Sequence, residues 1–141
     1  MGGFSQDELA KVIDHVFKTA TYTQHTNLYL ALTQSTIDDA DTGSTLPSEC
    51  SGGSYARIVC NTWDAASAGS PANRSTENTQ TESFAQATAN WGTATDFAVV
   101  THSSTGKVVC FGKLTAAKKI TTNDTASFAT GAIDIKITGT A

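Results

Sequence analysis

The feature that most constrains the fold is a change of hydrophobic period near residue 20. Before it, apolar residues recur at the three- and four-residue spacing of one helix face, at Leu9, Val12, Ile13, Val16 and Phe17. After it, segment 26–34 alternates, with Leu28, Leu30 and Leu32 on one side of an extended chain. The sequence therefore predicts an amphipathic α-helix over about residues 5–18, with Ser5 and Glu8 as a capping box, followed by a β domain.

Further strands are predicted from alternation and composition, at 55–60, 79–85, 96–102, 107–114, 125–129 and 132–138. In the last of these, Ile133, Ile135 and Ile137 are expected to be buried and the residues between them to face water. Residues 103–106, which end in Gly106, are expected to form a hairpin turn. We therefore expect one mainly β domain over residues 1–141, an antiparallel β-sandwich or jelly roll over about 26–138 with one N-terminal helix.

Two connections, 35–54 and 61–78, are predicted to be loops, and both are longer than loops usually are in compact domains. A helix of about 14 residues is marginal by itself, so the predicted helix must dock on the body of the domain or on a neighbouring subunit. Surfaces rich in aromatic anchors are typical of protein interfaces. The predicted contact residues are Phe4, Leu9, Val12, Val16, Tyr55, Arg57 and Trp63.

The composition excludes several classes of partner. The net charge is −4, and the nine Lys and Arg residues are scattered, which argues against a nucleic-acid footprint. No apolar run approaches the roughly 20 residues that a membrane-spanning helix needs. The N-terminus lacks the pattern of a signal peptide, so we expect synthesis in a cytoplasm, without nucleic-acid or membrane partners.

The stretch 48-SECSGGSYARIVC-60 invites phosphate, metal or redox interpretations. Its glycine pair lacks the Lys-Ser/Thr ending of a phosphate loop and precedes a strand pattern, so a turn is expected at Gly52-Gly53. A disulfide between Cys50 and Cys60 stays open as an alternative to free thiols, whereas Cys110 is expected to be a buried thiol. Arg57 either pairs with an acidic neighbour or lies in solvent.

No motif for catalysis, metal or cofactor binding is present in the sequence. His15, His25 and His102 lie in no nucleophile or metal pattern, and the cysteines lack zinc-site spacing. The acidic run Asp38, Asp39 and Asp41 departs from the calcium-loop pattern and is expected to be a solvated loop. We therefore expect a protein that is not an enzyme and carries no cofactor or metal.

Several segments taken together resemble a family of small virion proteins of tailed bacteriophages, whose genes are often labelled tail fibre or decoration protein. The resemblance covers about residues 13–138, in the expected order. It rests on DHVFKTATYT, NLYLALTQS, SGGSYARIV, SFAQATANWGTATDFAVV, SSTGKVVCFGKLTAAKKI and TTNDTASFATGAIDIKI. The resemblance implies a non-enzymatic structural component of the virion.

Two placements in the virion compete. A capsid decoration (cement) protein would bind the major capsid protein on the outer surface of the head, as a homotrimer or another homo-oligomer. A minor tail, tail-fibre or baseplate protein would lie at the tail end. The absence of a fibrous repeat or coiled-coil heptads favours the capsid surface, and long Ser/Thr/Asn/Gly loops suit wet contacts over flat protein surfaces. Capsid decoration, after synthesis in the cytoplasm of a bacterial host, is therefore the expected function.

Overall fold

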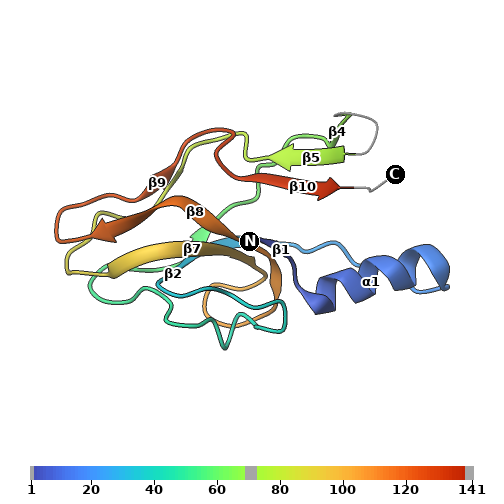
Figure 1. Cartoon of the computed structure of the whole chain (residues 1–141), viewed down its shortest axis with the longest axis horizontal. Helices are drawn as coiled ribbons and strands as arrows, with labels where there is room; N and C mark the ends of the chain where they lie inside the picture. Colours follow the sequence, from blue (N-terminus) through green and yellow to red (C-terminus); the bar gives the residue numbers. More distant parts are fainter. Residues whose placement is uncertain (1, 69–72, 139–141) are drawn as a thin grey trace.

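The computed structural model describes residues 2–68 and 73–138, which form antiparallel sheets in layers with one helix beside them (Figure 1). The largest sheet has five strands in the order β1-β8-β7-β2-β3. Their bounds are β1 Gly3–Phe4, β2 Tyr29–Thr33, β3 Ile58–Val59, β7 Gly92–Val100 and β8 Val108–Ile120. Every neighbouring pair in it is antiparallel. The helix α1 spans Gln6–Phe17 between β1 and β2.

Two smaller sheets lie over the large one. One has the order β10-β5-β4, and the other pairs β6 with β9. Their bounds are β4 Ser67–Ala68, β5 Asn73–Glu77, β6 Glu82–Ser83, β9 Ser127–Phe128 and β10 Asp134–Thr138. The predicted antiparallel β-sandwich with an N-terminal helix is thus confirmed, with its second layer divided into two short sheets.

The main core lies between the two layers. Leu30 and Leu32 of β2 point into it, as the alternation predicted, and Trp91, Phe84 and Ile133 meet them there. The opposite face of the large sheet carries Ala98, Val100 and Val108 and is covered by Ile37 from loop 35–54. The sheet is therefore covered on both faces at Leu30–Thr33 and Ala98–Val100, whereas residues 115–119 of β8 are exposed.

Three predictions about the strands need correction. Segment 61–78 was predicted to be a loop, but it contains β4 and β5; β5 has no apolar alternation and is held by backbone pairing with β10. Ile137 was expected to be buried, yet it is 61% exposed, because β10 runs past the core on its way to the edge. The strand predicted over 107–114 continues to Ile120 by pairing with the start of β7.

The hairpin between β7 and β8 forms as predicted. Gly106 has φ of 89°, which lies in the left-handed region that glycine adopts without strain. Loop 35–54 remains without strands of its own and is tied to the body by isolated bridges. One of these joins Thr33 to Glu49, and another joins Thr42 to Lys107. This loop therefore packs as part of the body.

Candidate functional site: an open helix face

Helix α1 is fixed to the body at its first turn. The backbone N–H of Ser5 donates to the carbonyl oxygen of Val109 in β8 at 3.1 Å, and that of Gln6 donates to the carbonyl of Asp39 at 2.9 Å. The Ser5 hydroxyl caps the helix by accepting from the backbone N–H of Glu8 at 3.3 Å. From this anchor α1 extends away from the β layers, at one end of the molecule (Figure 1).

Asp7, Lys11, Asp14 and Lys18 lie in one row along the helix and pair with each other. Lys11 contacts the carboxylate of Asp7 at 2.9 Å, and Lys18, just past the helix, contacts that of Asp14 at 2.9 Å. Both pairs have the i, i+4 spacing of neighbours on one face. Asp7 is also 3.6 Å from the ammonium of Lys107 in the hairpin between β7 and β8, so this charged row contacts the body at its first turn.

A second face of α1 carries a buried carboxylate, that of Glu8, whose side chain is 2% exposed. The Tyr22 hydroxyl donates to this carboxylate, and Nε2 of His25 lies 3.1 Å from its Oε2. Glu8, Tyr22 and His25 form what we call the Glu8 site. These contacts hold the segment that follows the helix against the side of α1. The backbone N–H of Tyr22 also donates to Nδ1 of His15 at 3.2 Å.

The pKa values of the Glu8 site follow from these contacts. Burial alone raises the pKa of Glu8, but hydrogen bonds from Tyr22 and His25 and the nearby charges outweigh it, so the net pKa lies below its ordinary value. Burial, with the hydrogen bond to Glu8, raises the pKa of Tyr22 to about 12. At neutral pH the site therefore holds an ionised carboxylate and a neutral phenol.

The third face of α1 is apolar and open. We call it the open stripe, and its residues are Leu9 (46% exposed), Val12 (44%), Ile13 (55%), Val16 (63%) and Phe17 (81%). An amphipathic helix normally turns such a stripe toward a core. Here the stripe lies outside the core that the rest of the described chain forms. Of the predicted contact residues, Leu9, Val12 and Val16 thus lie on one exposed surface.

Arg57, another predicted contact residue, lies inside the body. Its guanidinium forms a pair of bonds with the Glu49 carboxylate, at 2.8 Å from Nε and 2.7 Å from one terminal nitrogen. The remaining N–H groups donate to the carbonyl oxygens of Gly43, His102 and Thr105. All five donors of the guanidinium are used, so Arg57 and Glu49 form a clamp that joins three loops.

Tyr55, Trp63 and Phe4 also make their main contacts within the chain. The Tyr55 hydroxyl donates to Glu49 at 3.0 Å, and burial raises the Tyr55 pKa. The indole N–H of Trp63 donates to the carbonyl oxygen of Cys60 at 2.9 Å. Phe4 belongs to β1 and packs against the main core. The structure thus divides the predicted contact residues into an exposed group on α1 and a group that stabilises the body.

The cysteines are free and buried. The backbone N–H of Cys50 donates to the carbonyl oxygen of Leu32, and that of Cys60 donates to the carbonyl oxygen of Leu28. Leu28 precedes Leu32 by four residues in the same extended segment. Four extended residues span about 13 Å, beyond the roughly 7 Å between Cα atoms that a disulfide allows. The structure does not bring Cys50 and Cys60 together. Burial raises the pKa of Cys50 to about 11 and those of Cys60 and Cys110 to about 12.

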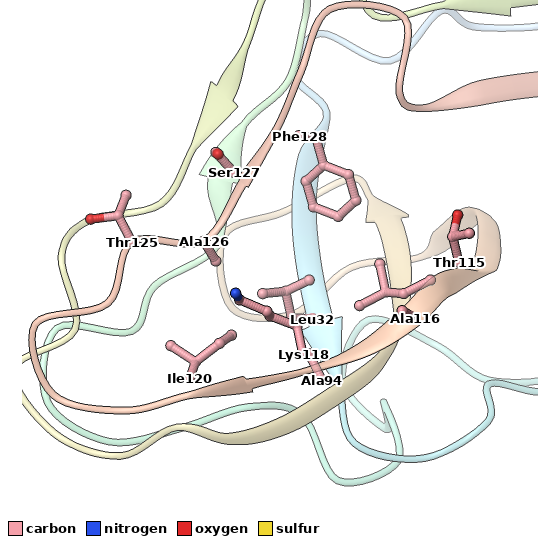
Figure 2. Close-up of a pocket in the computed structure, with 11 residues that line it drawn as sticks. Leu32, Ala94, Thr115, Ala116, Lys118, Ile120, Thr125, Ala126, Ser127 and Phe128 are labelled. Atoms are coloured by element: carbon pink, nitrogen blue, oxygen red, sulfur yellow. The ribbon is translucent and has the colours of Figure 1, made fainter.

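A cleft of about 410 Å³ opens between the large sheet and the segment 125–128 (Figure 2). Leu32, Ile120 and Phe128 contribute apolar surface to it, and Thr115 and Ser127 contribute hydroxyls. Among the described residues that line it, Lys118 is the one charged side chain. The cleft therefore offers apolar contact and a few hydrogen-bonding groups.

The acidic run in loop 35–54 closes a turn. The backbone N–H of Asp38 donates to Oδ2 of Asp41 at 2.7 Å, and Oδ1 of Asp38 accepts from Ala40, which lowers the pKa of Asp38. Over residues 2–68 and 73–138, no group of three or more His, Cys, Asp or Glu side chains is placed to hold a metal ion. In the same ranges no helix has the length and apolar character needed to cross a membrane.

The contacts of Glu8 and Arg57 were the part of this geometry that the sequence did not reveal. Glu8, three residues after Ser5, was assigned to a capping box, but its side chain reaches Tyr22 and His25 instead. The only available signal was the presence of polar aromatic residues directly after the helix. For Arg57, an acidic partner was one of two alternatives, and Glu49 is that partner.

The structure is thus a small β domain with an exposed apolar helix face, a kind of surface that is typical of interaction sites. A search of curated proteins finds no match to the chain. The family model described as Podophage GP4 fiber I protein gp80 matches residues 3–136, almost the whole length, and the chain belongs to this family of phage virion structural proteins. The predicted resemblance to small virion proteins of tailed phages is thereby confirmed.

Proposed function

We propose that this protein is a non-enzymatic structural subunit of a fibre at the tail end of a phage, and that the open stripe of α1 is the surface through which it joins its neighbours. The observation that carries the proposal is the match to a fibre-protein family over residues 3–136. The stripe supports it, because an exposed apolar surface of this kind is typical of an interaction site.

The division between body and helix suits such a subunit. The body packs an apolar cluster on each face of its large sheet and satisfies Arg57 internally, so we expect it to fold without a partner. Among the described residues, helix α1 is fixed at its first turn and by the Glu8 site, which leaves the open stripe available. Assembly through α1 would therefore leave the fold of the body unchanged.

Capsid decoration is the second candidate. It is favoured by the compact two-layer body, in which one helix and short strands replace the repeats that lengthen many fibres. In that role the protein would bind the major capsid protein on the outside of the head and clamp neighbouring capsid subunits. Both placements use the same open stripe, but they differ in copy number, because the head offers far more equivalent positions than the tail.

Quantitative mass spectrometry of purified virions, with immunogold labelling, separates the two placements. We expect few copies per particle and gold at the tail end. Hundreds of copies with gold over the head would replace the fibre assignment with capsid decoration. In that case particles that lack the protein should release their DNA at a lower temperature than complete particles. Absence of the protein from purified virions would overturn both candidates.

A further inference from the structure

We infer that the cleft between the large sheet and segment 125–128 is a binding site for a small amphipathic anion, an alkyl chain that ends in one carboxylate. The alkyl chain lies on the apolar walls of the cleft, and the carboxylate lies beside Lys118. The cleft volume of about 410 Å³ falls within the range of small-molecule sites, about 300–1,000 Å³. The cleft is part of the body and contains no residue of the open stripe, so the inference goes beyond the proposed function and does not rest on it.

The alternation of β8 directs Lys118 into this cleft. Lys118 and Ile120 are two residues apart and therefore share one face of the strand, and Ile120 is buried in the main core. The partner of Lys118 on β7 is Ala94, which belongs to the same core. Figure 2 shows the ammonium group of Lys118 directed toward Ala126, on the other side of the cleft. Lys119, the next residue along the strand, faces the opposite side of the sheet.

The ammonium group of Lys118 has no carboxylate within ion-pair distance among residues 2–68 and 73–138. The chain between Asp96 and Asp124 contains four lysines and no acidic residue. Asp124 uses its own carboxylate locally, because Oδ2 accepts the backbone N–H of Thr121 at 2.8 Å and its hydroxyl at 2.9 Å. These hydrogen bonds are the main cause that lowers the pKa of Asp124, and the charge of Lys118 is the smallest cause. An anionic ligand would therefore balance a positive charge that the cleft leaves without a close partner.

The apolar walls of the cleft are held in place by the fold. Residues 114–117 of β8 form a bulge, because they stand opposite Thr95 of β7 alone. Leu114 of this bulge forms one wall and packs against the main core. Phe128 of β9 forms another wall, and its ring packs edge-on against Phe97 with ring centroids 5.7 Å apart. The cleft is thus formed before a ligand binds, which lowers the cost of ordering the site.

The polar groups of the cleft suit a carboxylate. Besides Lys118, the described residues that line it contribute the hydroxyls of Thr115, Thr125 and Ser127, and none of these residues is Asp or Glu. Hydroxyl and ammonium groups both donate hydrogen bonds to a carboxylate. No other described residue forms a hydrogen bond with these three hydroxyls, so they can donate to a ligand. One lysine balances one negative charge, which favours a carboxylate over a multiply charged phosphate.

The first test is a titration of the full chain, labelled with nitrogen-15, with octanoate, hexanoate and octylammonium, each below the concentration at which it forms micelles. Nuclear magnetic resonance shows which amides respond. We expect octanoate to bind saturably and to shift the amide signals of residues 114–120 and 125–128. Hexanoate should bind roughly tenfold more weakly, because two fewer methylene groups are buried. Octylammonium has the same chain as octanoate but the opposite charge, and should bind at least about tenfold more weakly.

Paired variants test where the ligand lies. Lys118→Gln should weaken octanoate binding about tenfold, whereas Lys119→Gln, on the opposite side of the strand, should leave it unchanged. Ala116→Trp should fill the cleft and abolish binding, whereas Ala117→Trp, which is exposed but does not line the cleft, should not. All four positions are exposed, so the variants should keep the fold of the body, and their amide spectra check this.

Three results would overturn the inference. The first is the absence of saturable octanoate binding, and the second is equal binding of octylammonium, which would show that Lys118 does not select the charge. The third is a set of shifts confined to α1, which would place the alkyl chain on the open stripe. None of these results changes the location of the protein in virions, so the proposed function is tested separately.

Discussion

The side chains of the clamp find all their contacts within the chain, whereas those of the open stripe are left in solvent. At the clamp, each of the five N–H donors of Arg57 has an acceptor, and Glu49 shares a short double contact with it. On the open stripe, five apolar side chains of α1 are between 44% and 81% exposed. The polar groups of the clamp are satisfied within the chain, whereas the apolar side chains of the stripe face solvent. This contrast is the reason why we propose the stripe as the interaction surface.

The clamp and the stripe should also differ in how much a mutation changes the stability of the isolated chain. Removing a group from the clamp leaves a charge without its partner inside the body, which is costly whatever the state of assembly. Removing a group from the stripe should cost the isolated chain little, because the surface is already in water. The predictions below use this contrast, starting with the largest expected effect.

Arg57→Ala should lower the free energy of unfolding by about 3 kcal/mol or more, because it leaves the Glu49 carboxylate without its cation and three backbone carbonyl oxygens without their donor. Urea denaturation followed by tryptophan fluorescence measures this change. Arg57→Lys keeps the charge but has fewer N–H donors. Its free energy of unfolding should therefore lie between those of the unmodified protein and Arg57→Ala. A loss below about 1 kcal/mol for Arg57→Ala would mean that the clamp contributes no more than a surface ion pair.

Tyr22→Phe should lower the free energy of unfolding by about 1 kcal/mol, because the carboxylate of Glu8 loses one hydrogen bond while keeping His25. Tyr29→Phe makes the same chemical change in β2, outside the Glu8 site, and serves as the control. In a double-mutant cycle with Glu8→Gln, the effect of Tyr22→Phe should become smaller. Additive effects would show that the two side chains do not cooperate.

The Glu8 site should also make stability depend on pH. The folded pKa of Glu8 lies below its ordinary value of 4.5, so the unfolded chain binds the proton first as the pH falls. Its stabilisation is therefore complete well above pH 4.5 and is lost as the pH falls through the folded pKa. Tyr22, whose folded pKa is raised to about 12, should contribute stability below pH 10 that is lost between pH 10 and about 12.

Urea titrations of the unmodified protein and of Glu8→Gln across this pH range measure both effects. The difference in free energy of unfolding between the two proteins should shrink on the acidic side. A difference that stays constant from neutral pH to pH 3 would contradict the account of the Glu8 site.

The smallest expected effect concerns the thiols. Burial raises the pKa values of Cys50, Cys60 and Cys110 to about 11–12, so the reactive thiolate is scarce at pH 8. A thiol reagent should therefore modify the folded protein slowly and modify all three cysteines quickly once denaturant is added. Rapid reaction of one cysteine in the folded state would show that part of the body opens more readily than its burial implies.

The sequence predicted the parts of this molecule that depend on periodicity. The helix stripe and the alternation of Leu28, Leu30 and Leu32 each come from one apolar face. Such a face produces a regular spacing of apolar residues that can be read from the sequence. It did not predict β5, whose polar residues pair with β10 through backbone groups that carry no side-chain signal. Nor did it predict that Glu8 meets His25, or which carboxylate Arg57 meets, because long-range polar pairs depend on where the loops pass.

The central claim is that the body holds itself together within one chain, and we propose that the open stripe of α1 contacts a neighbouring virion protein. Hydrogen–deuterium exchange of the free chain and of purified virions tests it directly, because protection can be read separately for each region. Amides of β7 and β8 should exchange slowly in both samples. Amides of α1 should exchange quickly in the free chain and slowly in the virion. Equal protection of α1 in the two samples would contradict the account.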